Sequence, residues 1–130
     1  MIRSGRLALV PAAIAAAALV AACSGAPAGS GTPATAVPSG VVAVEAKEYA
    51  FTPSTITVPS GKVTFAVKNA GTQEHEFEIF KGETVVDEVE GLVPGLTKDL
   101  TVDLAAGEYT FMCKLNGHDQ LGMKGTLTVR

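Results

Sequence analysis

Residues 59–69 read PSGKVTFAVKN, a turn followed by a run in which apolar and polar side chains alternate. Val63, Phe65 and Val67 share one parity, while lysine, threonine and alanine occupy the other. A period of two places successive side chains on opposite faces of a β-strand, so this stretch predicts a half-buried strand. The Pro-Ser-Gly before the strand and the Asn-Ala-Gly after it are turn sequences that bound it.

The same alternation continues on both sides of this strand. Apolar residues share a parity at 42–46, 56–58, 75–79, 100–104, 109–113 and 127–129. Residues 83–93 are ambiguous between a short turn and an irregular edge, and no stretch has a convincing helical period. About seven or eight short strands separated by Gly/Pro turns predict an all-β fold, an antiparallel Greek-key β-sandwich.

The N-terminus predicts export. Residues 1–22 read MIRSGRLALVPAAIAAAALVAA, with a basic start, an apolar middle and a small-residue exit. This pattern is typical of a secretory signal peptide, and the run is slightly short for a comfortable transmembrane helix. Val20-Ala21-Ala22-Cys23 resembles the bacterial lipobox, which implies cleavage and lipidation of Cys23; an uncleaved anchor and an ordinary cleaved signal are the alternatives. An anchored chain would lie outside the cytoplasm, in the periplasm or on the outer cell surface.

The next stretch predicts a tether. Residues 24–40 read SGAPAGSGTPATAVPSG, a composition that cannot bury a core. We therefore expect a signal peptide at 1–22, a lipidated cysteine and flexible tether at 23–40, and one small folded domain at 41–130.

The charge of the chain excludes one class of partner. Without Arg3 and Arg6, eight basic residues remain against 13 acidic ones, a net charge of −5. The folded part has no basic patch, so nucleic-acid binding is not predicted. A basic redox partner would be attracted, but so mild a charge identifies no particular protein.

The folded part contains one cysteine, two histidines and two methionines. An exported lone thiol is buried and inert, paired with another chain, or bound to a metal. Taken singly, an inward histidine or cysteine is more often a core residue than a ligand, and Met123 more often a core filler. Taken together, His75, Cys113, His118 and Met123 are a soft-leaning donor set that favours copper, whereas structural zinc favours tetrahedral Cys and His ligands.

The spacing of the last three residues supports one loop. Cys113, His118 and Met123 follow the pattern C-x4-H-x4-M, and glycines at 117, 122 and 125 allow this segment to fold back on itself. His75 has the same parity as the apolar residues of its strand, so it is expected to point inward.

At this point the sequence resembles the cupredoxins, the family of plastocyanin, azurin and rusticyanin. The markers are Phe51-x-Pro53-x-x-Ile56-x-Val58, the stretch PSGKVTFAVKN, His75 and the segment 107–129. The resemblance implies one mononuclear type 1 (blue) copper site, with His75, Cys113 and His118 as equatorial ligands and Met123 as the weak axial one. The chain departs from the usual family pattern at Glu76, where many members have asparagine, and at Asn116, where relatives often have proline.

The resemblance implies a one-electron carrier that cycles between Cu(I) and Cu(II), and not an enzyme. His118 would present its ring edge at a surface framed by Gly117, Leu121 and Gly122. Redox partner proteins associated with the membrane would dock there, and we expect a monomer held to the membrane by its lipid anchor.

Two other functions remain open from the sequence. One is an exported copper-binding module for storage or delivery, in which Glu74, Glu76 and Glu78 would add oxygen donors, although a solvated strand face is the simpler interpretation of these glutamates. The other is a degenerate sandwich that binds a protein and no metal.

Overall fold

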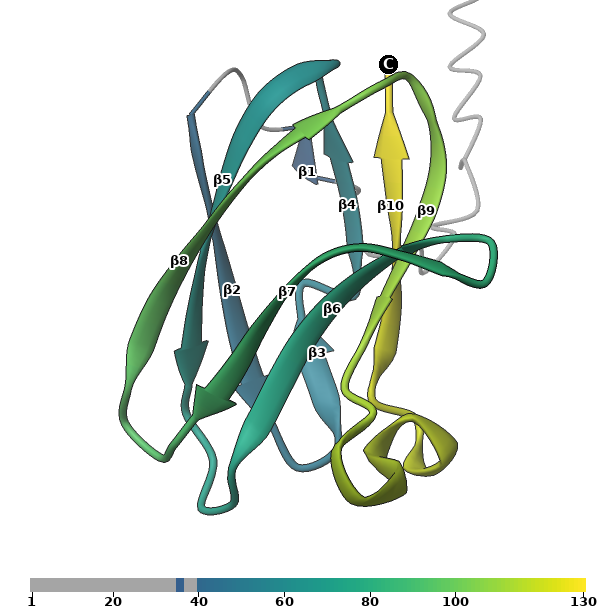
Figure 1. Ribbon diagram of the computed structural model, residues 1–130. Helices are drawn as coiled ribbons and strands as arrows, with labels where there is room; N and C mark the ends of the chain where they lie inside the picture. Colours follow the sequence, from purple (N-terminus) through teal and green to yellow (C-terminus); the bar gives the residue numbers. More distant parts are fainter. Residues whose placement is uncertain (1–34, 37–39) are drawn as a thin grey trace, which may run out of the picture. The chain divides into compact units, whose positions relative to one another are not determined.

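The computed structural model describes residues 35–36 and 40–130, so the predicted signal peptide, Cys23 and most of the predicted tether lie outside the described residues. The described chain forms two β-sheets packed as a sandwich (Figure 1), which confirms the predicted fold class. The elements are β1 (Thr35–Ala36), β2 (Val41–Lys47), β3 (Ala50–Thr52), β4 (Thr55–Val58), β5 (Gly61–Asn69), β6 (His75–Lys81), β7 (Thr84–Leu92), β8 (Thr97–Leu104), β9 (Gly107–Met112), the 3₁₀ segment η1 (Leu115–Leu121) and β10 (Lys124–Val129).

One sheet has six strands in the order β1-β4-β10-β9-β6-β7, and the other has four in the order β3-β2-β5-β8. Most neighbouring strands are antiparallel, but β2 pairs with β5 in parallel, and β4 pairs in parallel with both β1 and β10. The predicted antiparallel sandwich therefore also contains parallel pairs, which the sequence did not indicate. Between β2 and β5 the chain crosses to the other sheet as β4, and such a crossover makes a parallel pair possible.

The sheets contain more strands than the sequence pattern predicts, because two of them are very short. β1 has two residues and β3 has three, too few for alternation to be recognised. β1 lies within the predicted tether and pairs with β4. The ambiguous segment 83–93 is largely the strand β7, which forms an edge of the larger sheet.

The alternation in the sequence produces the core between the sheets. Along β2, residues switch regularly between exposed and buried, and the buried side chains join one apolar cluster with those of the other strands. Phe77 lies at the centre of an aromatic group, with ring centroids 5.2 Å from Phe111, 5.5 Å from Phe51 and 5.6 Å from Phe65. Aromatic pairs at such separations add to the stability that their burial provides.

One end of the sandwich carries the β2–β3 connection, the β5–β6 loop and η1 (Figure 1). Three segments far apart in the sequence therefore meet at this end. Within residues 35–36 and 40–130, no helical segment has the length and hydropathy that a membrane span requires.

Candidate metal centre

His75, Cys113 and His118 meet at this end of the sandwich. His75 begins β6, Cys113 directly follows β9, and His118 lies in η1. One side-chain donor atom from each residue lies within 4.8 Å of the other two, and the three residues are almost wholly buried. Three of the four candidate ligands predicted from the sequence thus form a side-chain cluster in the structure.

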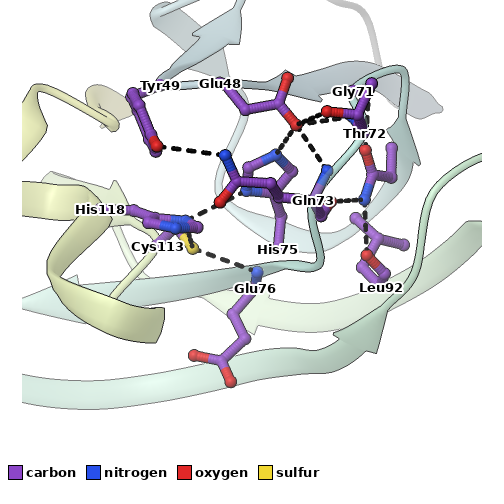
Figure 2. Close-up of polar contacts among 11 residues, drawn as sticks. Glu48, Tyr49, Gly71, Thr72, Gln73, His75, Glu76, Leu92, Cys113 and His118 are labelled. Carbon is purple, nitrogen blue, oxygen red and sulfur yellow. Dashed lines mark hydrogen bonds and ion pairs between the residues drawn. The ribbon is translucent and has the colours of Figure 1, made fainter.

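The donor atoms face one another across a short gap (Figure 2). The Nδ1 atoms of His75 and His118 are 3.3 Å apart, and Cys113 Sγ lies 3.5 Å from His118 Nδ1. The backbone N–H of Glu76 donates to Cys113 Sγ at 3.3 Å, so the side chain at position 76 is not needed for this bond. Two imidazole nitrogens and one thiol sulfur, all from buried side chains, fit the ligand preference of copper.

Burial sets the protonation of this cluster in the absence of a metal. It is the main cause of the raised pKa of the Cys113 thiol, and the charges of Glu76 and Glu78 act in the same direction. Burial also lowers the pKa of His75, against the opposing charge of Glu48. The cluster is therefore a neutral thiol with a neutral His75 ring, and a metal would have to displace the thiol proton.

The loop that holds Cys113 and His118 is fixed by its own backbone. Asn116 and Gly117 have φ angles of 51° and 75°, and Gly122 has a φ of 106°, all in the left-handed region that favours glycine. These turns reverse the chain, so that the N–H of Met123 donates to the His118 carbonyl at 3.1 Å.

Met123 is joined through its backbone to both Cys113 and His118. The N–H of Cys113 donates to the Met123 carbonyl at 3.1 Å, and the Met123 side chain is fully buried. The ligand role of its thioether remains a prediction.

Asn69 holds the loop that leads to His75, and this role was not predicted from the sequence. Its buried amide donates to the carbonyls of Gln73 and Leu92 at 2.7 Å each, and its carbonyl oxygen accepts the N–H of Gly71 at 2.8 Å. The Asn-Ala-Gly turn sequence was a signal for the last of these bonds, because asparagine side chains commonly bond the backbone two residues on.

Glu48, at the β2–β3 connection, was also missed. Its Oε1 accepts the N–H groups of Thr72 and Gln73 at 2.6 Å each and lies 3.5 Å from Nε2 of His75 (Figure 2). The Gln73 N–H, the residue's own backbone N–H and the Thr72 N–H lower the pKa of Glu48 to about 2. Glu48 precedes His75 by 27 residues, so no local pattern connects the two.

The surroundings of His118 include a residue that the sequence did not indicate. Only 3% of His118 is exposed, because the ring of Tyr49 packs edge-on against it with centroids 4.9 Å apart. Leu121 is 60% exposed, while Gly117 and Gly122 belong to the same loop segment. Tyr49 is therefore a further neighbour of His118.

The three glutamates near His75 do not form a uniformly solvated face. Glu74 is exposed and Glu76 half-buried, but Glu78 is buried, and its carboxylate accepts the N–H of Lys114 at 3.3 Å. Burial raises the pKa of Glu76 and Glu78. The interpretation of a solvated strand face is wrong for Glu78, because this side chain is buried against the backbone of Lys114.

Part of this chain is similar in sequence to known proteins. The iron uptake system component EfeO of Yersinia pseudotuberculosis is 43% identical over 77 residues, which cover 59% of this chain and 20% of EfeO. The chain therefore spans about a fifth of the length of this relative.

Two solved structures share the fold. Dithionite-reduced auracyanin from the photosynthetic bacterium Roseiflexus castenholzii matches with a TM-score of 0.67 and 25% identity, covering 72% of this chain and 99% of auracyanin. Auracyanin A, a "blue" copper protein of Chloroflexus aurantiacus, matches with a TM-score of 0.65 and 25% identity, covering 72% of this chain and 100% of that protein.

The family profile described as the cupredoxin-like domain matches residues 12–129, nearly the whole chain. Together with the His–Cys–His cluster, this fold supports one mononuclear copper site. The chain belongs to the cupredoxin-like domain family.

Proposed function

We propose that this protein is a one-electron carrier whose copper is held by His75, Cys113 and His118, with Met123 as a weak axial ligand. The observation that carries the proposal is the buried cluster of two Nδ1 atoms and one Sγ within 4.8 Å. Copper bound there would supply one-electron chemistry between Cu(I) and Cu(II).

The residues around the cluster suit this role because they hold it fixed. Cys113 and Met123 are joined through their backbones, and the loop before His75 is bonded by Asn69. A ligand set that cannot rearrange freely costs little reorganisation when its charge changes by one.

A partner would dock around His118, at a surface made by Gly117, Leu121, Gly122 and Tyr49. Leu121 is an exposed apolar side chain, and the ring of Tyr49 packs against that of His118. Such contacts suit the weak, transient encounters of redox proteins.

The sequence supports an exported and tethered protein. Residues 1–22 would be removed as a signal peptide, a lipidated Cys23 would anchor the chain, and residues 23–40 would tether a monomeric domain at 41–130. The tether would let the domain reach membrane-associated redox partners in the periplasm or on the outer cell surface.

Copper storage or delivery is the second candidate. The similarity to EfeO, named as an iron uptake system component, favours it, because metal uptake calls for binding and release. The same three donors would serve this function, so the two proposals differ in whether the site cycles between oxidation states.

The test is optical. The purified domain loaded with Cu(II) should become intensely blue or green through thiolate-to-copper charge transfer, and ascorbate should bleach it reversibly. Cys113→Ser should abolish the colour, whereas Met123→Gln, the matched control in the same loop, should keep a coloured site. A wild-type domain that stays colourless with Cu(II) but binds Cu(I) would refute electron transfer and favour storage or delivery.

A further inference from the structure

The second ring nitrogen of His75 faces a carboxylate. Its Nδ1 points toward the cluster, while Nε2 is buried and makes no hydrogen bond of good geometry with any described residue. The only ion-pair contact found for it among the described residues is Glu48 Oε1, at 3.5 Å. A polar atom that is buried without a partner is unfavourable, so the Glu48 carboxylate is the group that can stabilise Nε2 of His75.

The carboxylate of Glu48 is held in place by hydrogen bonds from the backbone. Two backbone N–H groups, from Thr72 and Gln73, donate to its Oε1 at 2.6 Å. Gly71 leaves the space for it, since a Cβ at position 71 would lie 2.5 Å from Oε1 and 2.6 Å from Oε2. In the described part of the chain, no lysine or arginine lies within ion-pair distance of this carboxylate.

We propose that Glu48 is a positioning residue for His75, which orients the ring through Nε2 and favours the oxidised over the reduced copper site. The proposal rests on the copper site proposed above. When Nδ1 binds a metal, the ring proton must reside on Nε2, and it then faces Oε1. A fixed negative charge behind the ring stabilises the more positive state of the site, and therefore lowers its reduction potential.

The first test replaces Glu48 by glutamine, which keeps the amide oxygen as an acceptor for the two N–H groups but removes the charge. Glu45→Gln is the matched control, because Glu45 lies exposed on β2, shortly before the connection that carries Glu48, and loses the same charge. We expect Glu48→Gln to reduce the ratio of Cu(II) to Cu(I) affinity about tenfold relative to the control, at the lower end of outer-shell effects. For a one-electron couple this corresponds to a rise of about 59 mV in potential.

The second test moves the carboxylate without removing it. Gly71→Ala places a methyl group where the carboxylate lies, at a position whose φ is not left-handed, so the flexible Glu48 side chain must shift. The potential should rise in the same direction as in Glu48→Gln, and the double variant should add little, because both changes break one contact.

The outcomes separate the two proposals. A wild-type domain without the charge-transfer colour would overturn the proposed electron-carrier function itself. A coloured wild type with Glu48→Gln at the potential of Glu45→Gln would overturn the role of Glu48 alone. If Glu48→Gln fails to fold, Gly71→Ala decides, and an unchanged potential in that variant also overturns the role.

Discussion

Among the glycines that the structure describes, Gly125 is the one at which an added methyl group should destabilise the fold most. It lies on β10, opposite Phe111 of β9. An added Cβ would lie 2.5 Å from Phe111 Cε2, and still closer to Phe111 Cζ and the Ser54 carbonyl oxygen. The Ser54 oxygen cannot move away easily, because it accepts the N–H of Thr126 at 2.9 Å. The ring of Phe111 must therefore yield.

The cost follows from what surrounds Phe111. This ring is fully buried and packs against Phe51 and Phe77 at centroid separations of 5.4 and 5.2 Å. Overpacking costs about 1–3 kcal/mol, and each weakened aromatic pair about 0.5–1.5 kcal/mol. We expect Gly125→Ala to lower the free energy of unfolding by about 2–4 kcal/mol, a large part of the ~5–15 kcal/mol of a small domain.

Urea unfolding of the metal-free domain measures this loss as a lower midpoint at unchanged slope. Gly82→Ala is the control: nothing lies within 4 Å of its Cβ, and its φ of +63° alone should cost about 1–2 kcal/mol. Since Gly125 and Phe111 each lie two residues from a candidate ligand, the copper-loaded variant should also change its visible spectrum. A loss no larger than that of Gly82→Ala would refute the packing argument.

Two further perturbations test the surroundings of the site. Asn69→Ala removes three hydrogen bonds of a fully buried side chain and should lower the free energy of unfolding by about 2–4 kcal/mol, measured by urea unfolding. A loss below about 1 kcal/mol would contradict the role of Asn69 in holding the loop before His75. Glu78→Gln should raise the free energy of unfolding of the metal-free domain at about pH 7 but not at about pH 3. Burial raises the pKa of Glu78 above its usual 4.5, so ionisation of this carboxyl opposes folding only once the pH rises past that value. Equal gains in the free energy of unfolding at both pH values, measured against wild type, would contradict this sign.

Much of the fold and of the cluster was predictable because both leave a local signal. Period-two alternation marks each longer strand, including the one from Gly61 to Asn69. Cysteine and histidine are so rare in this domain that His75, Cys113 and His118 stand out by composition, and the parity of His75 predicts its inward direction. These features depend only on neighbouring residues.

The features that were missed depend on contacts between distant strands. The parallel pairing of β2 with β5 results from a crossover that alternation does not encode. Glu78 has the parity of an outward residue, yet the backbone of Lys114 covers it. Glu48 meets His75 only because the β2–β3 connection and the β5–β6 loop lie at the same end of the sandwich.

The candidate ligands are fixed in two different ways. Cys113, His118 and Met123 belong to one loop, whose backbone hydrogen bonds join these three residues directly. His75 comes from another strand, and the loop before it relies on side chains, with Asn69 and Glu48 bonding its N–H and C=O groups. Changes at Asn69 or Glu48 should therefore perturb His75 while leaving the Cys113 loop intact. The tuning of this site is thus expected to lie on the His75 side, where side chains and not the backbone determine the position of the ligand.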